Sequence, residues 1–307
     1  MEEIRTDLAI EICGDILKHN PETSGIECNK SRCGPMELET VLIRNAEGES
    51  LSQKPIGRYW TLNTGRLWLD DRDTFRNKVL AFRDLIRSLF LEKIGTDGSV
   101  LVAGLGNEWI TADAIGPQTV RNLMVTRHLK RERPAIFEDL GLFDLCAITP
   151  GVLGQTGIES ADIVKSVVAG IRPELLLVID SLASRELERL VTTIQLCDSG
   201  IRPGSGIGNA RPALTPDALS IPVISIGVPT VVDAATLASD AMRRFAGTER
   251  DAEEIRKEWD KSNLNFFVTP KETDQIIRVM GSFIGYGINL ALNPSLSFEE
   301  MLSLTDQ

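Results

Sequence analysis

The sequence has few of the residues that build metal centres, disulfide scaffolds and histidine-based active sites. It contains two histidines and five cysteines among 307 residues. An odd number of cysteines in a chain of this size indicates free thiols rather than a disulfide framework. Cys13, Cys28, Cys33 and His19 lie near one another in sequence, but the C-x₄-C spacing of CNKSRC is not that of the common zinc knuckles. We therefore expect no metal and no other cofactor.

Positive charge and long apolar runs are also scarce. The chain has 33 Lys and Arg against 44 Asp and Glu, and 33 − 44 gives a formal charge of −11. This sign opposes binding to DNA phosphates or anionic lipid. No run approaches the ~18 to 20 apolar residues of a bilayer span, and the acidic start MEEIRTDLAIE does not resemble a signal peptide. We expect a cytoplasmic protein with no direct nucleic-acid or membrane partner.

What the chain does have is enough apolar residues, 42%, to bury a sizeable core. From about residue 99, short apolar runs alternate with amphipathic stretches, as in βαβ units. The predicted strands are residues 99–105, 145–149, 175–180, 192–197 and 222–228, and the predicted helices between them are 117–129, 160–170, 184–190 and 232–245. This pattern predicts an α/β fold with a mostly parallel sheet flanked by helices.

The first 95 residues have a different pattern. It predicts a helix over 8–18, a strand over 38–45 and a long helix over 72–93, whose apolar residues recur every three or four positions. Near the other end, a charged segment, 247–263, precedes a closing helix over 271–292. We expect a single domain, 1–307, in which residues 1–95 are an N-terminal addition packed on the sheet of an α/β core, 96–295.

Common nucleotide-binding and nucleophile motifs fail. Gly104 and Gly106 follow a predicted strand, but Trp109 stands where a dinucleotide fold needs its third glycine. The glycine-rich GSGIG at 204–208 lacks the Lys-Ser or Lys-Thr of a phosphate loop. No G-x-S-x-G elbow occurs, and two histidines offer little for a His-based triad.

Carboxylates are what the predicted strand ends carry, at Asp113, Asp180, Asp198 and Asp233. Ligands of open α/β sheets bind beyond the carboxyl ends of the strands, so several of these acids can converge. Two adjacent carboxylates do not both ionise easily: one keeps a proton and acts as an acid, while the other takes a proton from water. An Asp at a strand end also serves as a helix cap or turn residue, so spacing alone does not choose among the four.

The loops carry long literal motifs, in order VAGLGNEWITADAIGP, VTRHL, TPGVLGQTGIES, VIDSLASRELER, TIQLCDSGIRPGSGIGNAR, IPVISIGVPTVVDA and FFVTPKETD. Together they resemble the germination protease family of spore-forming bacteria, which cuts small acid-soluble spore proteins when a spore germinates. The opening IRTDLAIE resembles that family's mature amino terminus. The resemblance extends from about Ile4 to Leu292.

The resemblance implies an endopeptidase with a fold similar to the hydrogenase maturation peptidases and an unusual aspartic-type mechanism. The family's two essential acids lie in T-x-D-A-x-G-P and I-D-x-L-A-x-R, which match residues 111–117 and 179–185. The resemblance therefore selects Asp113 and Asp180 as the catalytic pair. We further expect the loop DSGIRPGSGIGNAR to shape the substrate cleft. We expect four substrate-binding residues. Asp198, Arg202 and Arg211 belong to this loop, and Asp233 follows the next predicted strand.

The resemblance also implies a homotetramer in the forespore or spore core, made as an inactive precursor with a propeptide. Only Met1, Glu2 and Glu3 precede IRTDLAIE here, so the activation step stays open. The stretch between SDAMRRF and FFVTPKETD is shorter than the family leads us to expect, and a subunit contact there is in question.

Two alternatives remain. One is a metal-dependent peptidase like the hydrogenase maturation enzymes, whose comparable loop carries a metal-binding acid; it would need a further acid or a histidine, for which His128 is the histidine candidate. The other is a non-catalytic binding module on the same fold, which would have no need of both Asp113 and Asp180.

Overall fold

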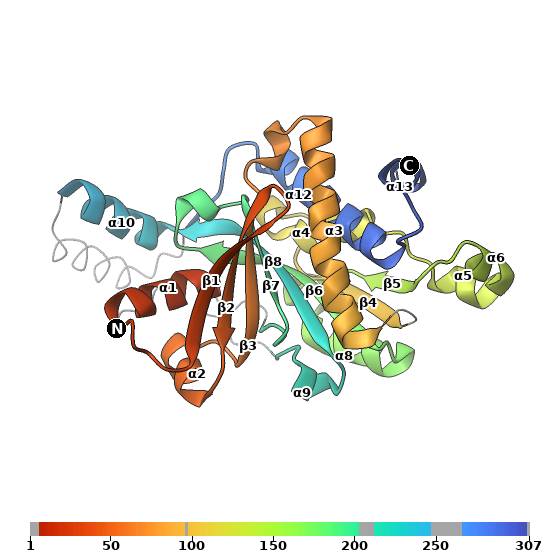
Figure 1. Cartoon of the computed structure of the whole chain (residues 1–307), viewed down its shortest axis with the longest axis horizontal. Helices are drawn as coiled ribbons and strands as arrows, with labels where there is room; N and C mark the ends of the chain where they lie inside the picture. The colour runs from red at the N-terminus through yellow and green to blue at the C-terminus, as the bar shows by residue number, and fades with distance from the viewer. Residues whose placement is uncertain (1–5, 96–97, 203–211, 247–265, 306–307) are drawn as a thin grey trace.

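A computed structural model describes residues 6–95, 98–202, 212–246 and 266–305. They form a central nine-stranded sheet flanked by helices, so the predicted α/β class is confirmed (Figure 1). The strands are β1 (Ile26–Cys33), β2 (Met36–Ile43), β3 (Gly57–Asn63), β4 (Ser99–Gly104), β5 (Asp144–Ile148), β6 (Leu175–Ser184), β7 (Thr193–Cys197), β8 (Val223–Asp233) and β9 (Phe267–Val268).

The sheet has the strand order β1-β2-β3-β7-β8-β6-β4-β5, with β9 added on β8. One detail of the prediction needs correction: parallel pairing is confined to β8, β6, β4 and β5, and the other strands pair antiparallel. The segment between β6 and β7 holds one 3₁₀ turn, η3 (Leu187–Arg189), where a helix over 184–190 was predicted. A parallel crossover needs a dozen or more residues, so this short segment returns the chain as an antiparallel strand. Because β3 then pairs with β7, the N-terminal strands continue the same sheet.

Five predicted helices are confirmed to within two residues at each end. They are α1 (Ala9–His19), α3 (Arg72–Ile94), α8 (Ser160–Ile171), α10 (Ala234–Ala246) and α12 (Thr273–Leu292). The shorter helices and 3₁₀ turns are α2 (Ala46–Ser52), η1 (Leu67–Leu69), η2 (Thr111–Asp113), α4 (Ile115–Arg121), α5 (Arg127–Glu132), α6 (Pro134–Asp139), α7 (Leu153–Thr156), α9 (Pro216–Leu219) and α13 (Phe298–Thr305). The charged segment 247–263 lies outside the described residues.

The helix predicted over 117–129 is wrong, since the chain breaks into α4 and α5. The break covers residues 122–126. It ends at Thr126, whose hydroxyl donates to the Phe143 carbonyl and accepts the N–H of Leu145 at 3.0 Å. Its own N–H donates to the Leu145 carbonyl at 2.9 Å. These bonds tie the chain to β5 and replace the bonds that a continuous helix would make.

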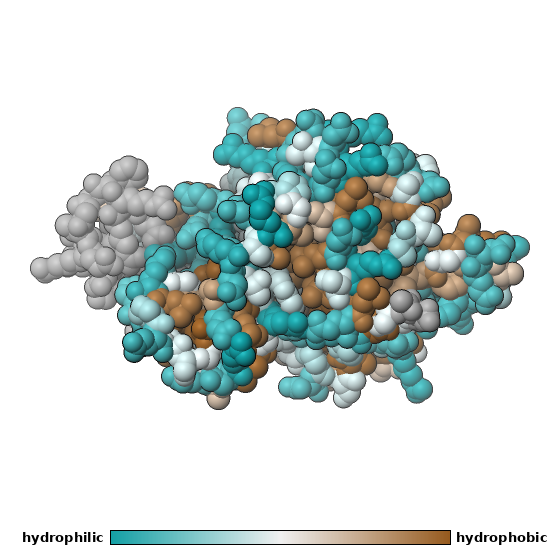
Figure 2. Space-filling view, viewed as in Figure 1, coloured by the Kyte–Doolittle hydropathy of each residue, from teal (hydrophilic) through white to brown (hydrophobic). Residues whose placement is uncertain are grey.

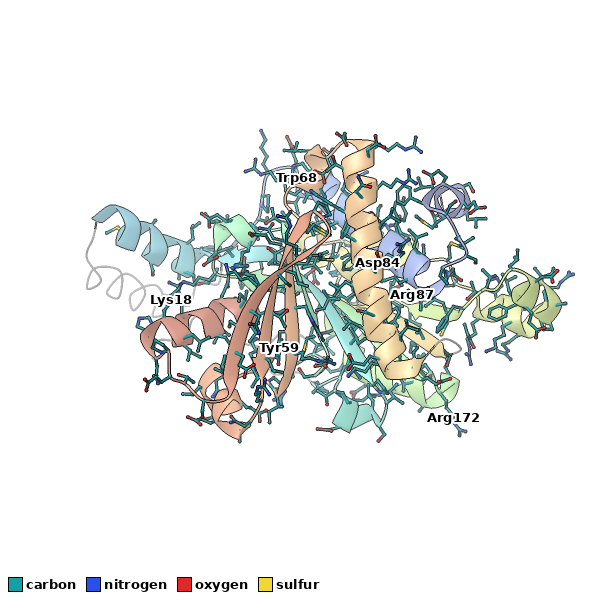
Figure 3. The ribbon with its side chains drawn as sticks, in the orientation of Figure 1. Lys18, Tyr59, Trp68, Asp84, Arg87 and Arg172 are labelled. Atoms are coloured by element: carbon teal, nitrogen blue, oxygen red, sulfur yellow. The ribbon has the colours of Figure 1, made fainter. Side chains whose placement is uncertain are left out.

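Apolar residues fill both faces of the sheet. On one face α3 and α12 pack through Phe82 and Phe283, whose ring centroids are 5.1 Å apart. On the other face α8 covers the parallel strands, and α1 packs on the N-terminal strands through Leu8, Ala9 and Cys13. The outer side of α3, which carries Asp84 and Arg87 (Figure 3), shows hydrophilic and hydrophobic residues intermixed (Figure 2). Within the described residues, no helix is long and apolar enough to span a membrane.

Strands β6 and β8 are longer than predicted. β4 stops at Gly104, in register with Ile179, whereas β6 continues to Ser184 beside β8. Asp180 therefore lies inside a ten-residue strand, whereas the sequence had predicted it at the strand's end. Since β4 no longer pairs with β6 beyond this point, the edge of β6 is open from Asp180 to Ala183, where Asp7 bonds to it.

Candidate active site

A cleft of about 810 Å³ lies at the open edge of β6. Asp113 from η2 and Asp180 from β6 both line it, and so does Arg202 beyond β7. Asp113 is half-buried, and Asp180 is 7% exposed. The structure thus brings three of the residues selected from sequence into one cavity.

The loop that carries Asp113 is held by close backbone contacts. Gly106 has φ +110°, and a Cβ on it would lie 1.9 Å from the Asp113 carbonyl oxygen. A Cβ on Gly116 would lie 2.2 Å from the Leu105 carbonyl oxygen. Only glycine permits these approaches, because any side chain would force the two segments apart. As a result the N–H of Asn107 donates to Asp113 Oδ2 at 2.8 Å, which turns the carboxylate back toward the end of β4.

The Asp180 carboxylate is turned toward the same place. The backbone N–H and C=O groups of successive β6 residues point alternately toward β8 and toward β4. Leu176 donates its N–H to the carbonyl of Pro222, just before β8, and the carbonyl of Ile179 accepts the N–H of Leu105, just after β4. The backbone groups of Ser181 therefore point toward the side of β6 on which β4 has already ended. Its N–H donates to Asp180 Oδ1 at 2.9 Å, which draws the carboxylate to the open edge.

Further contacts place the two acids near each other. The N–H of Leu105 donates to the carbonyl of Ile179 at 2.8 Å, so the loop after β4 begins beside the residue that precedes Asp180. The η2 turn with Asp113 at its end contacts both β6 and β8. Asp113 and Asp180 therefore line the cleft from two segments that meet at one edge of the sheet.

The other acids chosen from sequence make different contacts. Asp198 accepts the N–H of Arg58 at 2.8 Å and lies 3.1 Å from its Nε and 3.5 Å from Lys93 Nζ. Asp233 accepts both the N–H and the hydroxyl of Thr236, each at 2.9 Å, as a helix cap at the start of α10. Neither is among the described residues that line the cleft. Arg211 lies outside the described residues.

The histidines lie elsewhere too. His19 ends α1 and His128 belongs to α5, and both are exposed. In the part of the chain that the structure describes, no three His, Cys, Asp or Glu side chains are grouped in a way that could hold a metal ion.

Sequence reasoning missed Asp7, which also lines the cleft. Its N–H donates to the Ala183 carbonyl at 2.9 Å, and its Oδ2 accepts the Ala183 N–H at 2.9 Å. The N-terminal segment thus occupies the edge of β6 two residues beyond Ser181. The signal in the sequence was the opening IRTDLAIE, which was treated as the start of the mature chain and not as part of the site.

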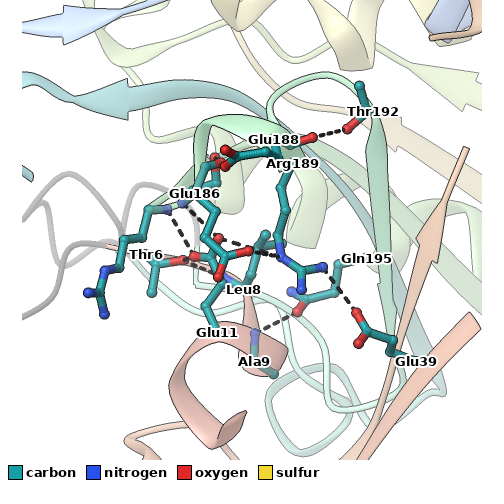
Figure 4. A network of polar contacts seen from close by, with 12 residues as sticks. Thr6, Leu8, Ala9, Glu11, Glu39, Glu186, Glu188, Arg189, Thr192 and Gln195 are labelled. Carbon is teal, nitrogen blue, oxygen red and sulfur yellow. Dashed lines mark hydrogen bonds and ion pairs between the residues drawn. The ribbon is translucent and has the colours of Figure 1, made fainter. Parts of the chain in front are cut away.

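A buried polar network fixes this N-terminal segment (Figure 4). The Glu11 carboxylate accepts the N–H of Arg185 at 2.9 Å and that of Glu186 at 3.0 Å, and Thr6 donates its hydroxyl to the same carboxylate. Gln195 on β7 accepts the N–H of Ala9 at 2.7 Å. These bonds join the N-terminal segment to the residues just after β6 and to β7.

A second wall of the cleft consists of Tyr59, Cys197 and Ser199. Ser199 Oγ lies 3.1 Å from the hydroxyl of Tyr59, which Figure 3 labels on β3, and 2.8 Å from Cys197 Sγ. Burial raises the pKa of both the tyrosine and the thiol. Both groups therefore stay protonated at neutral pH, and Cys197 is a poor nucleophile.

Comparison with known proteins finds relatives that match most of the chain. The family model described as germination protease matches residues 7–259. The chain is 40% identical to a germination protease of Clostridium perfringens (strain SM101 / Type A), with 98% of each chain covered. It is 36% identical to that of Bacillus subtilis (strain 168), with 96% of this chain and 95% of the relative covered. Among solved structures, a [NiFe] hydrogenase maturation protease, HycI of Thermococcus kodakarensis KOD1, is similar with TM-score 0.38 and 14% identity over 68% of this chain and 98% of its own.

The Glu11 network predicts a specific dependence of stability on pH. Burial raises the pKa of this carboxyl above its ordinary 4.5, against the opposing effect of its hydrogen bonds. The folded chain therefore holds this proton to higher pH than the unfolded chain. The free energy of unfolding falls as pH rises from about 4.5 through the folded pKa, by at most ~1.4 kcal/mol per pH unit.

Glu11→Gln replaces the ionisable carboxyl with an amide that stays neutral at every pH. The variant should therefore become more stable relative to the wild type as pH rises over that range. Urea unfolding of both proteins at a series of pH values measures the difference. A wild type that instead gains stability over the variant would show that the hydrogen bonds, and not burial, dominate at Glu11.

Proposed function

The chain belongs to the germination protease family, and from this premise we propose that it cleaves small acid-soluble spore proteins, using Asp113 and Asp180 to activate a water molecule. Membership makes it a spore germination protease, a hydrolase of peptide bonds. The substrate and the aspartic-type mechanism are the proposal. The observation that carries it is that Asp113 and Asp180 line one cleft at an open strand edge.

Two carboxylates in one cleft suit peptide hydrolysis. Close carboxyl groups share a proton, because ionising both places like charges side by side. The ionised carboxylate takes a proton from water as it attacks the peptide carbonyl carbon, and the protonated partner donates to the oxygen on which negative charge develops. Return of a proton to the leaving nitrogen then breaks the C–N bond. Both acids receive a backbone N–H, so each is held in place for this exchange.

Asp113→Asn and Asp180→Asn should each lower kcat by about 10²- to 10⁴-fold, since each removes one partner in proton transfer. Glu49→Gln is the matched control, because this exposed acid of α2 lines the same cleft and loses the same charge. It should retain nearly full activity. Cleavage of a purified small acid-soluble spore protein, followed by gel and mass spectrometry, measures all three variants.

The same assay includes a chelator. Under the proposal the wild type keeps its activity. Loss of that activity, restored by added zinc or manganese, would support the metal-dependent alternative instead. Full activity in either Asn variant would contradict the carboxylate pair.

We also propose that the loop after β7 sets substrate preference. Arg202 lines the cleft, and a guanidinium there pairs readily with an acidic substrate side chain. In this proposal Arg211 adds a second cation from the same loop. Asp198 supports the loop from its start through Arg58, and Asp233 caps α10 at the end of β8.

Arg202→Ala should raise KM for peptides with acidic residues near the cut bond by about 2- to 5-fold, the worth of a partly exposed ion pair. KM for peptides with glutamine at those positions should not change. Arg131→Ala, which removes an exposed arginine of α5, is the control. Equal effects on acidic and neutral peptides would contradict a charge-pairing role.

The remaining proposals rest on the family alone. We propose a homotetramer in the spore core, produced as a precursor. Light scattering at micromolar concentration should give about four times the chain mass of 33.7 kDa. A monomer under these conditions would refute the tetramer, with the short segment 247–263 as the place to look.

A further inference from the structure

Two hydroxyl groups in the cleft have no role in the account so far. Ser181 Oγ and Thr230 Oγ1 are buried and make no hydrogen bond with any described residue. Both residues line the cleft, and Thr230 is 0% exposed. A buried hydroxyl without a partner costs roughly 1–3 kcal/mol, so two such groups in one cleft indicate that a hydrogen-bonding group binds there.

The position of Thr230 comes from an irregularity in β8. Leu182 of β6 is in register with Pro229, but the next residue, Ala183, is in register with Val231. Thr230 is thus the extra residue of a β-bulge, a feature that re-aims a side chain and is common beside active sites. The bulge lies opposite the part of β6 that follows Asp180 and Ser181.

We infer that the hydroxyls of Ser181 and Thr230 bind the main chain of the substrate peptide beside the bond that is cut. This inference rests on the proposed peptidase function and names the residues that hold its substrate. A hydroxyl both donates and accepts, so it matches either the N–H or the carbonyl of a peptide group. A bound peptide would supply the partners that neither hydroxyl finds among the described residues.

The charges of the cleft favour a neutral group at this subsite. Asp7, Asp113 and Asp180 line the same cavity, so a substrate carboxylate held here would face like charges. The backbone of β6 points to the same conclusion. On its open edge Ile179 is bonded to Leu105 and Ala183 to Asp7, with Ser181 between them. A peptide that enters this interval lies beside Ser181, whose N–H already donates to Asp180, so its binding there depends on side-chain hydroxyls.

The test uses variants that remove one hydroxyl each, Ser181→Ala and Thr230→Val. Because these hydroxyls have no hydrogen-bond partner among the residues that the structure describes, neither variant should lose stability in urea. With a small acid-soluble spore protein as substrate, each should lower kcat/KM by about 3- to 10-fold, the worth of one hydrogen bond. Thr230→Ser, which keeps a hydroxyl, should recover most of the loss.

The chain offers a matched control in Thr61. Its Oγ1 is equally buried and unpartnered among the described residues, but it lies on β3 and is not part of the cleft lining. Thr61→Val should therefore change neither stability nor kcat/KM. This control separates the loss of a substrate contact from the general effect of removing a buried hydroxyl.

Binding is measured separately so that a failure of the inference differs from a failure of the function. On an Asp113→Asn background, the Kd of a synthetic peptide spanning the cleaved bond should rise 3- to 10-fold in the Ser181→Ala and Thr230→Val variants. N-methylation of one substrate amide should produce a loss that is not additive with one of these variants.

Normal cleavage by both hydroxyl variants, with unchanged Kd, would overturn the inference and leave the peptidase function standing. Loss of stability in both would also overturn it, because the hydroxyls would then have a structural role. If the two hydroxyl variants weaken peptide binding as predicted but the wild type does not cleave the peptide, the function would be refuted and the subsite supported.

Discussion

The site depends on one difference in strand length. β4 ends at Gly104, while its neighbour β6 runs on to Ser184 beside β8. A strand edge without its neighbour leaves N–H and C=O groups that need partners. Here the Asp180 carboxylate takes one of them, the N–H of Ser181, and Leu105 and Asp7 bond the residues on either side. The same unequal length that opens the edge therefore also aims an acid into it.

The N-terminal segment limits how far that edge stays open. Asp7 bonds to Ala183 through both its backbone and its side chain, and Glu11 receives the N–H groups of the two residues that follow β6. The N-terminal segment consequently closes this end of the β6 edge at Ala183. Part of this closure depends on the carboxyl of Glu11. Burial disfavours its ionisation and raises its pKa, so the stability of the closed end is linked to pH.

Periodic segments were predictable from sequence, and the irregular ones around the site were not. α3 and α12 carry long apolar stripes, so their bounds were found to within two residues. The ends of β6 and β8 were missed because SLAS and PTVVD combine small, polar and proline residues typical of loops. Asp113 and Asp180 were chosen from four acids by family resemblance, since spacing cannot reveal that Asp198 and Asp233 bond to Arg58 and Thr236. The bulge at Thr230 depends on long-range pairing that no local pattern encodes.

The central claim is that peptide bonds are cut at the open edge of β6, between Asp113 and Asp180. A crystal structure of the Asp113→Asn variant with an uncleaved peptide from a small acid-soluble spore protein tests it most directly. The account predicts an extended peptide along β6, with its cleavable carbonyl within about 3 Å, directly or through one water, of the residue 113 amide and the Asp180 carboxylate. A peptide bound on another surface, with the β6 edge empty, would contradict it.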